Sequence, residues 1–149
     1  MTKDELRKDY PWVKVEIECG DGWLPLISAL CSRLSWYCDQ HNVKRPVVKQ
    51  IKEKFGALVF YIDSQHWQTT VGKGMYAIIA DYEAMSRFVC EYCGTTVGVG
   101  WSTGWIRSLC KQCFESKISP RWPNREWKLE HNPMDVVTNL SMAPLKKEE

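Results

Sequence analysis

The chain has 149 residues, of which 44% are hydrophobic and 26% charged, and this composition fits one globular domain with a small additional lobe. Its formal net charge is only +2, so the charge of the whole chain gives no case for nucleic-acid binding. No apolar run reaches the ~18 residues of a membrane helix and no signal-peptide core precedes the chain's seven cysteines, so we expect reduced thiols, a cytoplasmic location and no membrane partner.

The first predicted element is a half-buried strand over residues 12–18, because apolar and charged side chains alternate there. A helix of roughly Leu24 to Asp39 follows, since apolar residues recur at helical spacing and Pro25 suits a first helical turn. Cys31 and Cys38 lie about 10.5 Å apart along this helix, which is too far for a disulfide. We therefore expect both cysteines, with Cys19, to be thiols of the core.

A hairpin is predicted next, with arms over residues 47–54 and 57–63 and its turn at Phe55-Gly56. The second arm is apolar throughout, which is typical of a central strand. The first arm carries lysines on its polar face, at Lys49, Lys52 and Lys54, and residues 44–61 hold five basic side chains against one acidic. These lysines would either meet phosphate or an acidic protein surface, or be a solvated face that resists edge pairing; we favour the solvated face.

Residues 64–74 read as a loop, and a second amphipathic helix is predicted from Met75 to Val89. The fold class predicted is therefore α+β: a small antiparallel sheet with two amphipathic helices and an appended four-cysteine, zinc-ribbon-like lobe. Three regions are expected. They are an α+β core over residues 1–89, a zinc-binding lobe over 90–113, and an irregular segment over 114–149 that packs on the core and ends in a flexible tail.

Two C-x-x-C pairs separated by sixteen residues form the most informative motif: Cys90, Cys93, Cys110 and Cys113. Each pair can place two thiolates on one metal ion, and a hairpin-sized spacer brings the pairs together into a tetrahedron. Gly94 directly follows the first pair and can adopt a positive φ, which lets backbone amides turn toward the sulfurs. The pattern predicts one structural Zn²⁺ ion. Two disulfides or a thioredoxin-like pair are the alternatives, but no βαβ pattern surrounds either pair.

Tryptophan marks two candidate contact surfaces. Trp101 and Trp105 stand among glycines in the spacer, where they would be exposed interface anchors or would fold back onto the second helix. Further along, Arg121, Trp122, Arg125 and Trp127 interleave cations with indoles, as single-strand binding surfaces do. The same segment equally suits a strip that packs on a sheet with arginines stacked on tryptophan faces, and we favour this packing role.

Three sequence blocks carry a resemblance: G-W-L-P-L-I from Gly22, I-K-E-K-F-G-A-L-V-F-Y from Ile51, and the paired cysteines with Gly104-Trp105 between them. They resemble a group of small bacteriophage proteins that share G-W-x-x-L-I, I-K-E-K-F-G-x-L-x-F-Y and two cysteine pairs. The resemblance covers about residues 21–113. It implies a viral origin and the zinc site, but no reaction.

Together these patterns predict a non-enzymatic zinc-binding phage protein in the cytoplasm of an infected bacterium. Its expected partner is a host or defence-system protein that it inhibits. The alternative is a nucleic-acid-binding accessory factor. A third hypothesis is an HNH-like nuclease, suggested by Glu130-His131 and Asn139. In that family the acidic-His step falls between the cysteine pairs, whereas here it follows both.

Overall fold

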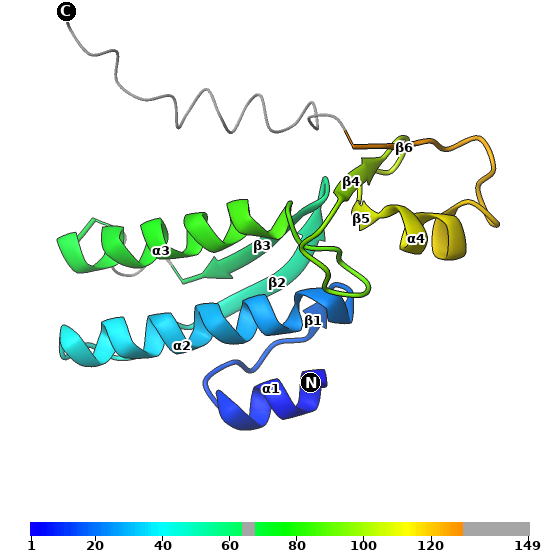
Figure 1. Ribbon diagram of the computed structural model, residues 1–149. Coiled ribbons are helices and arrows are strands. Elements are labelled where there is room, and N and C mark those ends of the chain that lie inside the picture. Colours follow the sequence, from blue (N-terminus) through cyan, green and yellow to red (C-terminus); the bar gives the residue numbers. More distant parts are fainter. Residues whose placement is uncertain (64–67, 130–149) are drawn as a thin grey trace, which may run out of the picture.

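Two three-stranded sheets organise the computed structural model, which describes residues 1–63 and 68–129. The α+β class predicted from the sequence is confirmed, and a lobe with its own sheet lies at one end of a larger core (Figure 1). None of the described helices is long and apolar enough to cross a membrane. The elements in chain order are α1 Lys3–Asp9, β1 Ile17–Glu18, a 3₁₀ turn Asp21–Trp23, α2 Leu24–Gln40, β2 Val48–Lys54, β3 Ala57–Ile62, α3 Thr70–Ser86, β4 Val99–Ser102, β5 Ser108–Cys110, α4 Lys111–Cys113 with its extension Phe114–Ile118, and β6 Trp127–Lys128.

Helix α1 was not predicted, although the sequence holds its start signal. The Thr2 side chain accepts a hydrogen bond from the amide of Glu5 at 3.1 Å, and the Glu5 carboxylate accepts one from the Thr2 amide at 2.8 Å. This reciprocal pair is a capping box, which satisfies amide groups that the first turn of a helix leaves without partners. The helix is short because only Leu6 is buried in the core.

The first sheet has the order β1-β2-β3, with β1 parallel to β2 and β2 antiparallel to β3. The predicted strand over residues 12–18 is wrong in length, since only Ile17 and Glu18 pair with β2. Its alternation nevertheless describes the burial, because Val13 and Ile17 are both in the core. The sheet is thus mixed rather than purely antiparallel.

The prediction that residues 57–63 form the central strand is also wrong, because β2 lies between β1 and β3. Helix α3 covers the outer edge of β3 instead. The Leu58 amide donates to the Ser86 hydroxyl at 2.8 Å, and the Phe60 amide donates to the Glu83 carboxylate at 2.9 Å. An apolar strand can therefore sit at the edge, since side chains of α3 satisfy the amides that a neighbouring strand would otherwise pair.

Helix α2 matches the prediction closely, but α3 begins at Thr70, within the segment expected to be a loop. Thr69 caps it by accepting a hydrogen bond from the Gly72 amide at 2.9 Å. Gly74 lies inside this helix, and glycine is unfavourable in helices, so the sequence pattern did not predict a helix there. A Cβ atom there would overlap the hydroxyl of Tyr37, which donates to the Val71 carbonyl at 2.9 Å, so the glycine lets α2 approach α3.

The second sheet has the order β5-β4-β6 and takes its third strand from the segment after the second cysteine pair. Gly100 in β4 leaves room for the Trp127 ring and the Lys128 carbonyl of β6. The lobe has a small buried cluster of its own, separate from the larger core cluster: Cys90, Leu109, Cys113, Phe114 and Ile118.

Candidate metal centre

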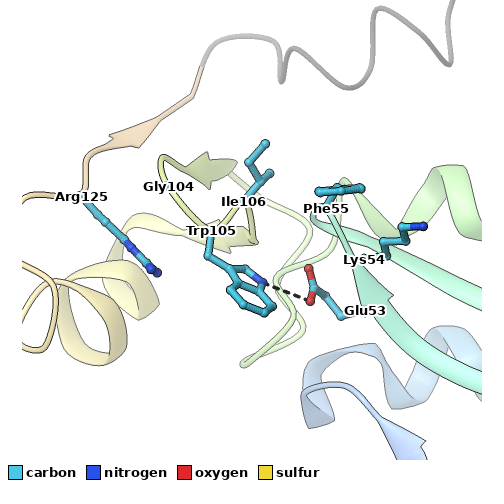
Figure 2. Close-up of a pocket in the computed structure, with 7 residues that line it drawn as sticks. All are labelled: Glu53, Lys54, Phe55, Gly104, Trp105, Ile106 and Arg125. Atoms are coloured by element: carbon cyan, nitrogen blue, oxygen red, sulfur yellow. Dashed lines mark hydrogen bonds between the residues drawn. The ribbon is translucent and has the colours of Figure 1, made fainter.

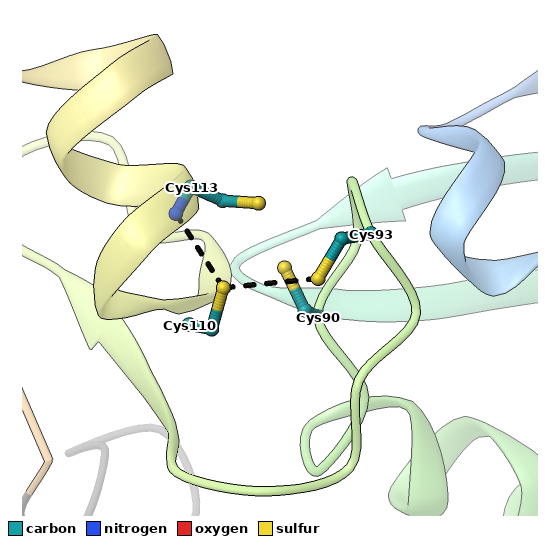
Figure 3. Close-up of side chains that lie close together, drawn as sticks. All are labelled: Cys90, Cys93, Cys110 and Cys113. Atoms are coloured by element: carbon teal, nitrogen blue, oxygen red, sulfur yellow. Dashed lines mark hydrogen bonds between the residues drawn. The ribbon is translucent and has the colours of Figure 1, made fainter.

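The four cysteines of the two pairs converge on one point, and their sulfur atoms all lie within 4.8 Å of one another (Figure 3). The Cys93 and Cys110 sulfurs are 3.7 Å apart. A tetrahedral ion with bonds of about 2.3 Å to sulfur separates its ligands by about 3.8 Å, whereas sulfurs in a disulfide are about 2.05 Å apart. The four thiols are free and are placed to hold one metal ion.

The first cysteine pair sits on a tight turn that follows α3. The Gly94 amide donates to the Cys90 carbonyl at 2.9 Å, and the Cys90 amide donates to the Thr95 carbonyl at 2.9 Å. Gly94 has a φ of 78°, the left-handed conformation that its lack of a Cβ was expected to permit. The folded turn thus places both sulfurs of the first pair on the side that faces the second pair.

The second pair is placed by the transition from strand to helix. Cys110 ends β5 and caps α4, and its sulfur accepts a hydrogen bond from the Cys113 amide at 3.4 Å. Cys90 and Cys113 are buried, Cys110 is half-buried and Cys93 is exposed. The site therefore lies at the edge of the lobe, with one sulfur facing outward.

Backbone amides affect the sulfurs unequally. Burial acts to raise the pKa of Cys90, but the amides of Cys93, Cys110 and Tyr92 outweigh it and the pKa is lowered. Burial and neighbouring thiols raise the pKa of Cys113. The amides favour the thiolate form at Cys90, and a bound metal ion would displace the remaining thiol protons.

The other three cysteines behave differently, as the sequence predicted. Cys19, Cys31 and Cys38 are buried in the core as free thiols. Burial raises the pKa of Cys19 and of Cys31 to about 12. Burial thus favours the neutral thiol form in the core, and among the described residues only the four cysteines of the lobe converge as a possible metal site.

A buried glutamate, Glu91, joins the turn that carries the first cysteine pair (the metal turn) both to the rest of the lobe and to the core, and the sequence patterns did not predict it. Glu91, between the first two ligands, is only 1% exposed, and both of its carboxylate oxygens lie 2.9 Å from Nη1 of Arg107. The Gly20 amide also donates to this carboxylate, at 3.1 Å, and the Gly22 amide donates to the Glu91 carbonyl at 2.8 Å. Burial raises the pKa of the Glu91 carboxyl, although the charge of Arg107 and the hydrogen bonds from Gly20 and Arg107 act to lower it.

Several of the predicted contact residues meet where the lobe joins the core. A pocket of about 520 Å³ lies between the β2–β3 turn and the β4–β5 turn, and Lys54, Phe55, Trp105 and Arg125 are among its lining residues (Figure 2). Trp105 is 61% exposed, and its indole N–H lies 3.5 Å from a Glu53 carboxylate oxygen. A second pocket, of about 410 Å³, shares Trp105 and Arg125 with the first and adds Arg121 and Trp122.

The remaining predicted contact residues lie elsewhere. Lys49 forms an ion pair with Asp63 at 3.8 Å, and Lys52 stands opposite Glu18 of β1. Trp101 lies in β4, with the Lys128 ammonium 5.9 Å from its ring centre, and the Trp127 indole donates to the Leu109 carbonyl at 2.9 Å. The structure thus brings Lys54, Trp105, Arg121, Trp122 and Arg125 together and separates the others from them.

The arginine–tryptophan stacking considered for residues 121–128 is present. The guanidinium carbons of Arg121 and Arg125 lie 5.1 and 4.6 Å from the centre of the Trp122 ring. Glu130, His131 and Asn139, which suggested a nuclease, lie outside the described residues, as does the tail expected to be flexible.

No protein-family model matches the chain, and no curated protein or solved structure is significantly similar to it.

Proposed function

We propose that this chain is a zinc-stabilised phage protein that acts by contact, binding and inhibiting a host or defence-system protein rather than catalysing a reaction. The observation that carries the proposal is a pair of exposed aromatic side chains, Phe55 and Trp105, at the two sides of the pocket between core and lobe. Aromatic residues beside a concave pocket are typical anchors of protein–protein interfaces.

Both aromatic side chains are held by folded backbone. Phe55 occupies the left-handed region, with a φ of 51°, next to Gly56 with a φ of 80°, so the β2–β3 turn is of the type that matches strand twist. The turn is fixed from both sides. The Gly56 amide donates to the Glu53 carboxylate at 3.0 Å, and the Ser108 hydroxyl of the lobe donates to the Gly56 carbonyl at 2.5 Å.

The turn that carries Trp105 is equally constrained. The Ser102 hydroxyl donates to the Trp105 carbonyl at 2.9 Å and accepts a hydrogen bond from the Arg107 amide at 3.1 Å. Phe55 is 50% exposed and Trp105 is 61% exposed, so large apolar area is presented without the loss of main-chain freedom on binding. Preorganisation of this kind raises affinity by lowering the entropic cost of association.

The ion in this proposal is zinc, because four thiolates in a tetrahedral arrangement suit Zn²⁺ among the common metals. Its role is structural. The lobe's cluster of buried residues is small, and the four sulfurs complete the contacts that hold β5, α4 and the first cysteine turn together. The resemblance to small bacteriophage proteins supports the infected bacterium as the setting.

The proposal is tested by affinity capture from host lysate with the tagged, zinc-loaded protein. We expect one stoichiometric protein partner, and we expect its recovery to fall at least about tenfold with the double variant Phe55→Ala, Trp105→Ala, as for loss of interface hot spots. Trp36→Ala is the matched control, since Trp36 is an exposed indole of α2 with Arg33 over its ring and lines neither pocket.

Equal recovery with the double variant and the control would remove this surface from the proposal. Failure to capture any protein from several host lysates, with metal content and fold intact, would overturn the proposed mode of action itself.

A further inference from the structure

The second pocket of the lobe, of about 410 Å³, is lined mainly by cations and aromatic rings. Tyr92 comes from the turn that carries the first cysteine pair, and Arg107 directly precedes β5. The other cationic and aromatic lining residues come from the segment that follows the last cysteine: Lys117, Arg121, Trp122 and Arg125. Three stretches of chain, separated in sequence, therefore converge on one concave surface of a size suited to a small ligand group.

The positive charge of this pocket is largely uncompensated. Arg107 is neutralised by the buried Glu91 carboxylate. Among the residues that the structure describes, Lys117, Arg121 and Arg125 form no ion pair with a carboxylate, and Lys117 and Arg121 are exposed. Three cations thus face one pocket in a chain whose total formal charge is only +2, which concentrates the positive potential there.

The three cations are held near one another by a folded segment. The Arg121 and Trp122 amides donate to the Ile118 carbonyl at 3.1 and 3.0 Å, and the Arg125 amide donates to the Trp122 carbonyl at 3.1 Å. Ile118 itself is buried in the lobe. The cationic side chains consequently project from a turn anchored on the lobe's apolar cluster.

We propose that this pocket binds single-stranded nucleic acid, with Lys117, Arg121 and Arg125 contacting phosphates and the tryptophans contacting bases. The inference goes beyond the proposed function and does not depend on it. Phosphate is the ligand that clustered, unpaired guanidinium and ammonium groups favour.

Aromatic rings select a single strand over other polyanions. Trp122 remains 41% exposed although Arg121 and Arg125 lie over its ring, and the exposed Trp105 also lines the pocket. A single strand offers unstacked bases whose faces pack on indole and guanidinium planes. In a duplex the faces of the bases are buried in the base stack, and poly-glutamate has no aromatic faces.

The test uses fluorescence anisotropy of the zinc-loaded chain with a labelled single-stranded oligonucleotide, the matching duplex and a labelled poly-glutamate peptide. We expect tightest binding to the single strand. For three phosphate contacts the plot of log affinity against log salt should have a slope of roughly −2.

Charge variants locate the site. Replacing Lys117, Arg121 and Arg125 together with glutamine should weaken single-strand binding about 100-fold at ~0.1 M salt, as the loss of three phosphate contacts predicts. The control variant replaces three exposed lysines outside the lobe, Lys8, Lys14 and Lys44, with glutamine and so removes the same charge. This control should change the affinity by less than about threefold. The double variant Lys117→Gln, Arg121→Gln changes only exposed side chains and serves if the triple variant is unstable.

An equal loss of single-strand affinity in the pocket variant and in the control variant would show a non-specific effect of charge and would contradict binding at this pocket. Tighter binding to the duplex or to poly-glutamate than to the single strand would overturn the ligand class. Absence of oligonucleotide binding by a folded, metal-loaded protein would overturn the whole inference while leaving the protein-capture experiment unaffected.

Discussion

Glycine at positions 20 and 22 decides how closely the metal lobe approaches the core. A Cβ atom at Gly20 would overlap the Glu91 carbonyl, and one at Gly22 would overlap the carbonyls of Cys90 and Glu91. Their amides form the hydrogen bonds that join the core to the metal turn. These two residues therefore act through the absence of a side chain, at a distance of some seventy positions from the cysteines they support.

Gly22→Ala should destabilise the protein by about 3 kcal/mol, the upper end for overpacking of a tight contact, because either carbonyl must move. For a chain of this size each kcal/mol lowers the Tm by about 2–4 °C, so thermal unfolding of the zinc-loaded protein measures the effect. Gly98→Ala is the control. Gly98 has a φ of 63° and open space around it, so that variant bears only a backbone cost of about 1 kcal/mol. Equal Tm values for the two variants would contradict the steric account.

The four candidate metal ligands were predictable from the sequence, whereas the residues that support them were not. The spacing of Cys90, Cys93, Cys110 and Cys113 identifies the set because C-x-x-C turns are local features. The contact of Glu91 with Arg107 and the glycines depends on how the lobe docks, and no periodicity in the sequence encodes it. A charged residue between two cysteines, together with a Gly-Asp-Gly stretch far upstream, was the faint signal available.

Among the elements, α3 has two roles, since it packs its apolar side chains in the core and covers the edge of β3 with Ser86 and Glu83. The helix over residues 24–40 and the β2–β3 hairpin were predictable from local patterning. The start of α3 was not, because Gly74 serves a contact with Tyr37 on another helix. The order of the strands was not predictable either. An edge strand that a helix covers, such as β3, has the same apolar sequence pattern as a central strand.

Glu83 gives this edge a dependence on pH. Burial raises the pKa of its carboxyl above the ordinary value, although the hydrogen bond from the Phe60 amide lowers it. The folded state then holds the proton more tightly than the unfolded state, so the stabilisation is complete below the unfolded pKa and is lost as pH rises through the folded pKa. Glu83→Gln keeps an acceptor for Phe60 without titrating, so its Tm relative to the wild type should rise as the pH increases from the ordinary pKa of a glutamate carboxyl toward mildly alkaline values.

The exposed Glu18→Gln variant controls for the loss of one negative charge. A difference in Tm between Glu83→Gln and the wild type that stays constant over this pH range, or that shrinks as pH rises, would refute the account of Glu83.

For the molecule as a whole, stability is divided between two clusters of buried residues. The larger cluster contains residues from Leu6 to Ile79, and the smaller one contains the lobe's apolar residues with two of the cysteines. Structural zinc contributes ~10–16 kcal/mol of apparent binding free energy in small domains, which is comparable to the stability of an entire domain. The lobe should therefore depend on its ion far more than the core does.

Chelation of the metal should unfold the lobe and leave the core folded. Hydrogen exchange followed by mass spectrometry should show loss of protection in β4 and β5 and retention in α2, with recovery on adding Zn²⁺. Elemental analysis should find one zinc ion per chain in the wild type and in the control Cys19→Ser, and a markedly lower content in Cys93→Ser. Full protection of the β4 amides after complete removal of the metal would contradict the prediction that the lobe depends on its ion for folding.

The exposure of Cys93 has a consequence for how an ion would leave. The other three sulfurs are shielded by protein to a greater extent, so an incoming chelating thiol or an oxidant meets Cys93 before any other ligand. Ligand exchange would then begin at Cys93 and continue to the more buried sulfurs. The lifetime of the bound ion would be governed by the single solvent-facing bond to Cys93 rather than by opening of the surrounding fold.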